Sequence, residues 1–208
     1  MNWNRTVFLH IGWTSRYDGS EAPEGGHAYL KRSVGVEAEN FKALDGWCYG
    51  YAPVSRTSEG RSESGTQRAS RTLNISKLGA STFAKEIDGI TVVWTARHPV
   101  HGPVIVGLYD KAIVFRLMPG LSNDTRPFIA KARDVDCHLV PESRRSFDIV
   151  QKRQGFPGMA AAWFPGLHED GPPKEMLAQV ADYLPTVRRY SRFGTTSQEA
   201  NTNVPRIR

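Results

Sequence analysis

Histidines and cysteines are the residues in this sequence best suited to metal binding or nucleophilic chemistry. Of the six histidines, only His98 and His101 lie close together, on a proline-containing turn without Cys, Asp or Glu beside them. Zinc sites need three or four clustered ligands, so no metal site is predicted. Cys48 and Cys137 are far apart and lack a partner pattern, which indicates packing residues in a reducing compartment rather than a disulfide scaffold.

The serines, glycines and carboxylates of the sequence form no catalytic motif either. No serine lies in a G-x-S-x-G elbow, and no glycine cluster matches a phosphate-binding loop or a Rossmann fingerprint. Asp134 and Asp136 have a spacing that suits acid–base catalysis, but two carboxylates at a turn usually just face water. No catalytic residue and no cofactor are therefore predicted. A hydrolase whose residues are distant in sequence stays open as an alternative.

Aromatic residues next to loops are the feature that points to ligand binding. They neighbour glycine, proline or polar residues, a pattern that suits a pocket for a planar ligand. Trp94 lies in an apolar run and favours core packing, whereas Trp13 ends a strand and begins a polar loop, where pocket and packing are equally open. The full set is Trp13, Tyr17, Trp47, Tyr49, Tyr51, Trp94 and Tyr109.

The elements that must position these aromatics are mostly strands, so an α+β, mostly β fold is predicted. Strands are expected at 6–13, 47–51 and 90–96, the last one central, and at 104–109 and 112–116, which continue it as an antiparallel meander. Apolar residues at helical spacing predict one helix that begins after Pro173, with Pro185 kinking or shortening it. One domain over 1–193 is expected, with a mobile polar loop at 55–72 and a flexible tail or linker at 194–208.

The net charge of +6 and a pI near 9.5 permit contact with phosphate groups but do not establish it. Five arginines after residue 187 account for much of the excess, so the rest of the chain is mildly cationic. No stretch approaches the ~18 apolar residues of a membrane span, and the start of the chain lacks a signal-peptide pattern. A cytoplasmic protein without membrane contact is expected.

Several segments of the chain together form a recognisable pattern. They are Phe8–Trp13 with Tyr17 and Gly19, Asn40–Phe41, Tyr49–Tyr51, Leu73–Ala80, Val92–Ala96, Val104–Arg116, Ala130–Ala132, Cys137–Pro141, Arg145–Phe147, Gly158–Met159 and Trp163–Phe164. Together they resemble an N-terminal domain found in bacterial HNH endonucleases. The resemblance covers about residues 7–190, although the HNH half itself is absent. In that family the segment at 107–112 usually reads Gly-Trp-Tyr-x-Asn-Ala, so Leu108 and Lys111 are departures.

That domain is similar to the PUA-like group with its EVE, YTH and SRA modules, compact β-barrels with flanking helices that hold a flipped base. The resemblance implies a DNA-binding specificity domain that reads a modified base in double-stranded DNA, without catalysis of its own. An HNH modification-dependent restriction endonuclease, in the same chain or as a partner, would then cut the DNA in phage defence. An RNA or single-stranded nucleic-acid-binding PUA-like module is the alternative.

Base flipping costs a few kcal/mol, which stacking and edge hydrogen bonds can offset. Loop placement predicts that the segments 12–15 and 94–98 converge on one pocket. The predicted base-pocket residues are Trp13, Thr14, Ser15, Tyr17, Trp47, Tyr49, Trp94 and Thr95. The predicted phosphate-binding residues are Arg16, Arg56, Arg61, Arg68, Arg71, Arg97 and His98.

Overall fold

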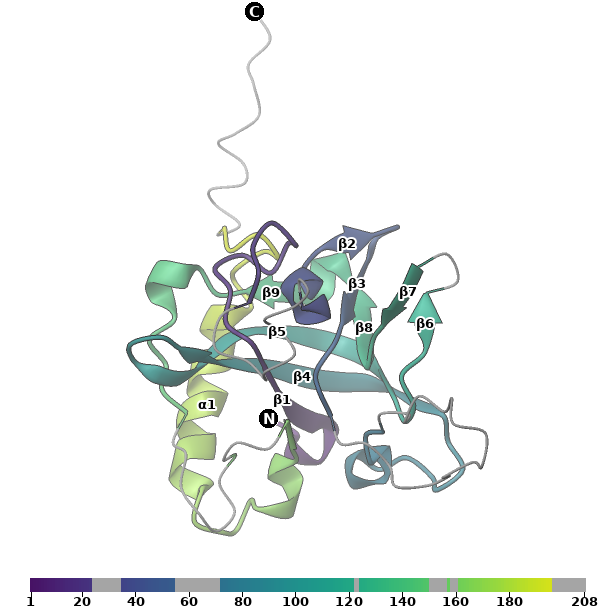
Figure 1. The fold of residues 1–208 in the computed structure, drawn as a ribbon. Coiled ribbons are helices and arrows are strands. Elements are labelled where there is room, and N and C mark those ends of the chain that lie inside the picture. The colour runs from purple at the N-terminus through teal and green to yellow at the C-terminus, as the bar shows by residue number, and fades with distance from the viewer. Residues whose placement is uncertain (24–34, 55–71, 122–123, 150–156, 158–160, 196–208) are drawn as a thin grey trace, which may run out of the picture.

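A computed structural model describes residues 1–23, 35–54, 72–121, 124–149, 157 and 161–195. The fold is mostly β with one α-helix, as predicted (Figure 1). The strands are β1 (Thr6–Ile11), β2 (Ala43–Leu44), β3 (Trp47–Gly50), β4 (Glu86–His98), β5 (Gly102–Phe115), β6 (Gly120–Leu121), β7 (Asp124–Pro127), β8 (Ala130–Arg133), β9 (Cys137–Leu139) and β10 (Ala162–Trp163), and the helix is α1 (Lys174–Val187). Short 3-10 helices are η1 (Trp3–Arg5), η3 (Val36–Glu39), η4 (Ile75–Leu78), η5 (Asp134–Asp136), η6 (Glu142–Arg144) and η7 (Pro165–Leu167).

The main sheet is mixed and, over the described residues, open, in the order β10-β1-β4-β5-β8-β3-β2, with β9 paired to β5. β4 is central, as predicted, but β1 runs parallel to it, so the sheet is not a simple antiparallel meander. The segments 104–109 and 112–116 are one strand, β5, rather than two. Asp110 and Lys111 form an irregularity inside it, where Lys111 has a positive φ of 49°. A bulge of this kind bends a strand without ending it.

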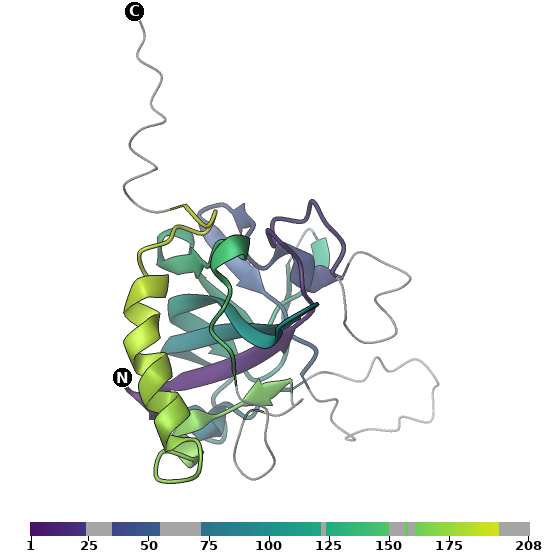
Figure 2. The ribbon, with the colours of Figure 1, turned by 90° about the vertical axis from the view of Figure 1, so that its left-hand side faces the viewer.

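Two apolar clusters pack against opposite faces of this sheet. On one face, Phe8, Val93 and Leu108 contact the apolar stripe of α1, which lies along the sheet in Figure 2. On the other face, the cluster includes Trp94 and Tyr109 together with residues of β3 and β8. Alternation of side chains along a strand explains why neighbouring residues enter different clusters.

Pro185 and residue 194, two boundaries suggested by the sequence, do not end the ordered structure. α1 continues through Pro185 to Val187, because this proline lies in the exposed last turn and removes only one helical hydrogen bond. The predicted tail begins at residue 194, yet the Thr195 carbonyl still accepts a hydrogen bond of 2.8 Å from the Ser191 amide. The predicted mobile loop lies outside the described residues except for Thr72, which forms a β-bridge with Leu117.

Candidate functional site

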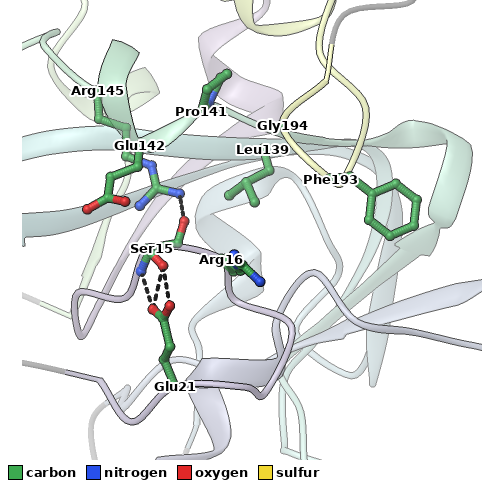
Figure 3. Close-up of a pocket in the computed structure, with 9 residues that line it drawn as sticks. All are labelled: Ser15, Arg16, Glu21, Leu139, Pro141, Glu142, Arg145, Phe193 and Gly194. Carbon is green, nitrogen blue, oxygen red and sulfur yellow. Dashed lines mark hydrogen bonds between the residues drawn. The ribbon is translucent and has the colours of Figure 1, made fainter. Parts of the chain in front are cut away.

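Two adjoining hollows lie beside the loop that follows β1. We call them the Trp13 hollow, of about 340 Å³, and the Arg145 hollow, of about 400 Å³. Ser15, Glu21 and Glu142 line both. The Trp13 hollow is completed by Trp13, Thr14 and Ala22. The Arg145 hollow is completed by Arg16, Leu139, Pro141, Arg145, Phe193 and Gly194 (Figure 3).

Arg145 holds the loop in place from the interior side of the protein. Its side chain is 2% exposed, and its guanidinium donates to the carbonyl oxygens of Val140 (2.8 Å), Thr14 (2.7 Å) and Ser15 (Figure 3). Burial lowers the pKa of Arg145, but an arginine stays charged inside proteins. A buried cation therefore joins the loop to the segment after β9.

Glu21 closes the same loop from the solvent side. Its carboxylate accepts from the Ser15 amide at 3.0 Å and from the Ser15 hydroxyl at 2.6 Å, and the Thr14 hydroxyl donates to it at 3.2 Å. Figure 3 shows Ser15 between the Glu21 and Arg145 side chains. These hydrogen bonds, the Ser15 hydroxyl first, lower the pKa of Glu21. The loop is thus preorganised by charged groups on both sides.

Tyr17 lies beneath the loop and not at the rim where it was predicted. Its ring is fully buried and lies 6.0 Å from that of Phe41, and its hydroxyl donates to the Gly12 carbonyl at 2.8 Å. Burial raises its pKa well above the ordinary value. The Glu37 carboxylate accepts from the Gly12 amide at 3.1 Å. Tyr17 and Glu37 together fix the point where β1 becomes loop.

Trp13 forms a wall of its hollow and is not an open stacking platform. Only 6% of it is exposed, because the Arg145 guanidinium lies 4.9 Å from its ring centre and the His98 ring packs edge-on at 4.5 Å. The His98 Nδ1 atom accepts from the amides of Val100 (3.0 Å) and His101 (3.2 Å). The 12–15 and 94–98 segments therefore meet at Trp13 and His98, but no residue of 94–98 lines either hollow, so they do not converge on one pocket as predicted.

Glu142 has the carboxylate of this site that is most available to accept hydrogen bonds from a ligand. Its carboxylate is exposed, lines both hollows and forms no ion pair or side-chain hydrogen bond with the residues that the structure describes. Arg16 and Arg97 are exposed cations, of which Arg16 lines the Arg145 hollow. Arg56, Arg61, Arg68 and Arg71 lie outside the described residues.

Trp94 and Thr95 line neither hollow. Trp94 is fully buried against Tyr109, and Gly50 packs so closely on its ring that a Cβ would overlap it. Its Nε1 atom has no hydrogen-bond partner among the described residues. The Thr95 hydroxyl donates to the Leu9 carbonyl at 3.4 Å, across the parallel β1–β4 pair. Both belong to the interior of the sheet, which corrects their placement in the pocket.

Trp47 and Tyr49 also lie apart from the hollows. They occupy β3, which pairs with β8 at the far side of the sheet from β1. The Arg133 guanidinium lies 4.2 Å and the Lys131 ammonium 5.1 Å from the Trp47 ring centre. The structure therefore separates the predicted aromatics into a loop group, a core group and this strand group.

The Ser15 hydroxyl beside the Glu21 carboxylate invites a test for nucleophilic catalysis. A carboxylate with a lowered pKa is a weak base, and a serine nucleophile needs a base that can take its proton. Within the described residues, no group of three or more His, Cys, Asp or Glu side chains is placed to hold a metal ion. The arrangement suits binding of a polar ligand.

Sequence reasoning missed Arg145, Glu21 and Glu142 as site residues. The contact between Arg145 and the Thr14 carbonyl spans 131 residues, so no local sequence pattern predicts it.

The two cysteines, predicted to be packing residues, are both buried. None of the helices in the described ranges is both long and apolar enough to span a membrane. Searches of protein-family models, curated proteins and solved structures found no match.

Proposed function

We propose that this protein binds DNA and holds a modified, flipped base in the Trp13 hollow, without a catalytic step of its own. In this proposal the mixed sheet with its flanking helix corresponds to a PUA-like barrel of the EVE, YTH and SRA type. The chain serves as the specificity domain of a modification-dependent restriction system, with an HNH nuclease in cis or trans. The nuclease rests on the sequence resemblance alone.

The Glu142 carboxylate, which has no ion-pair partner among the described residues, is the observation that carries the proposal, because it lies at the shared wall of the two hollows. A carboxylate accepts hydrogen bonds from exocyclic amino groups of bases, such as N4 of cytosine. Both volumes fall in the range of ~300–1,000 Å³ that is typical of small-ligand sites. Thr14 and Ser15 add fixed polar groups, so the edge of a base would meet hydroxyl and carboxylate groups.

Preorganisation of the loop also supports a function in recognising a modified base. Arg145 and Glu21 hold Ser15 and Thr14 before any ligand arrives, so little entropy is lost when a base enters. Arg16 and Arg97 are exposed near this loop and at the end of β4, where they can contact phosphates. Shape and hydrogen bonding at the hollow would then supply specificity, and the cations would supply affinity.

Binding to duplexes that differ in one base tests the proposal. Fluorescence anisotropy compares matched duplexes with cytosine, 5-methylcytosine, 5-hydroxymethylcytosine, adenine or N6-methyladenine at one position. Glu142→Gln should weaken binding of the preferred duplex by about 5- to 150-fold, because one good base contact is worth ~1–3 kcal/mol. Glu175→Gln, an exposed acidic position on α1, is the matched control.

Trp13→Ala opens the hollow wall and should reduce discrimination among the duplexes. Equal binding of all duplexes by the unaltered protein, or unchanged binding of the preferred duplex by Glu142→Gln together with unchanged discrimination by Trp13→Ala, would overturn the proposal. Strong binding of a single-stranded RNA competitor at the Glu142 site would instead support the alternative RNA-binding module. Circular dichroism of each variant confirms that the fold is retained.

A further inference from the structure

One half of the sheet has an outer face without a helix over it among the described residues. On the first half of β5, Ile105 and Leu108 face α1. The helix ends at Val187, and the Arg188 guanidinium that follows it pairs with Asp110 of β5 at 2.6 Å and 2.9 Å. Beyond Asp110 the described helix no longer covers the strand.

Successive side chains of a strand point to opposite faces of the sheet, and this alternation decides which residues reach the uncovered face. Ala112 and Val114 of β5, Ala130 and Ala132 of β8 and Cys48 of β3 point into the core cluster. The intervening residues therefore point outward, and all of them are half-buried or exposed. We call this set the Trp47 face; it consists of Trp47, Tyr49, Ile113, Phe115, Lys131 and Arg133.

The Trp47 face combines aromatic rings with cations in fixed register. Trp47 is paired with Arg133, and Tyr49 with Lys131, across β3 and β8. The Lys131 ammonium lies between two rings, 5.1 Å from the centre of Trp47 and 5.7 Å from that of Phe115. Phe128 packs edge-on between Tyr49 and Phe115, at 5.0 and 5.3 Å, and so holds both rings in place.

The cations of this face are Lys131 and Arg133. Among the described residues neither forms an ion pair, whereas Lys111 pairs with Asp136 at 3.0 Å. Asp45 and Asp134 flank the β3 and β8 ends next to Arg133 and limit the cationic area there. Within the described part of the chain, positive charge thus remains beside the aromatic rings, and an anionic partner with planar groups matches both features.

We propose that the Trp47 face binds a single-stranded polynucleotide, with bases stacking on Trp47 and Tyr49 and phosphates contacting Lys131 and Arg133. Stacking needs no particular base, because every base has a π-face, and a sheet surface with aromatic and cationic side chains is suited to it. This site shares no residue with the Trp13 hollow, so its test is independent of the base-reading proposal.

Anisotropy with fluorescein-labelled oligothymidylate of about 15 nucleotides tests the proposal, because sites of this kind span ~4–16 nucleotides. Trp47→Ala should weaken binding by about 5- to 150-fold, the loss of one stacked base, and Trp47→Phe should restore most of it. The double variant Lys131→Gln and Arg133→Gln should flatten the salt dependence by about 1.4 in log–log slope. Its matched control is Lys174→Gln with Arg189→Gln, two exposed cations on or beside α1.

Binding that is unchanged in both Trp47→Ala and the double cation variant would overturn the proposal. So would equal losses in the Lys174 and Arg189 control, because the effect would then be one of net charge. If Trp47→Ala does not fold, Tyr49→Leu and Trp47→Phe replace it. Tyr49→Leu should then weaken oligonucleotide binding, and Trp47→Phe should not. An oligouridylate arm distinguishes RNA from DNA as the strand, and Glu175→Gln should leave binding of either unaltered.

Discussion

Replacement of Arg145 by methionine removes three hydrogen bonds at once while keeping a similar side-chain length. The carbonyl oxygens of Val140, Thr14 and Ser15 lose their charged donor. A buried polar group left without a partner costs ~1–3 kcal/mol, and water from the adjoining hollow can reach part of this cluster. We expect the free energy of unfolding to fall by about 3 kcal/mol, a large share of the ~5–15 kcal/mol of a typical domain.

Urea unfolding at neutral pH measures this loss, and hydrogen exchange of the Gly12–Tyr17 amides tests whether the loop opens first. Arg145→Lys should lie between the wild type and Arg145→Met, because a lysine cannot direct donors to three carbonyls. Arg144→Met, at the exposed neighbouring position, should change stability by less than about 0.5 kcal/mol. A loss below about 1 kcal/mol for Arg145→Met would refute the view that Arg145 organises the loop.

Three further outcomes follow from the packing and the pKa shifts. Gly50→Ala places a Cβ on the Trp94 ring, so thermal unfolding should show a loss of about 1–3 kcal/mol; unchanged stability would contradict this packing. The pKa of Glu21 is lowered in the folded state by Ser15, so its contribution is present above the ordinary value of 4.5 and is lost as pH falls through the folded pKa. The stability difference between wild type and Glu21→Gln should therefore vanish on acidification, and a difference that grew there would reverse the sign. Burial strongly raises the pKa of the Cys137 thiol, so thiol reagents at pH 8 should modify the cysteines only as the protein unfolds; modification at the rate of a free thiol would show that they are accessible.

Local patterns were sufficient to predict the helix and the segments that form β1, β3, β4 and β5. The β-branched run at 90–96 became the centre of β4, and the apolar spacing after Pro173 became α1. Each of these signals lies within one element, so it can be read without its neighbours. Local patterns fail at the Asp110-Lys111 pair. Its residue types suggest a turn, but the pair forms a bulge because β5 keeps pairing with β4 on both sides of it.

The placement of the predicted pocket residues depended on contacts across the chain. Trp13 comes just after the apolar strand β1 and Trp94 lies within the apolar strand β4, yet one forms a hollow wall and the other is fully buried. Trp47 was predicted at the same pocket but lies on the outer face of β3, because strand register decides which face a residue takes.

A mostly β chain, a helix near its end and an aromatic loop after the first strand can all be predicted from local sequence patterns. Which aromatics meet depends on the folded chain, since Arg145 reaches the Thr14 carbonyl across 131 positions and the sheet order separates Trp47 from Trp13. Strand periodicity and loop composition are local properties. Pairing partners and buried charges depend on segments that become neighbours only when the chain folds.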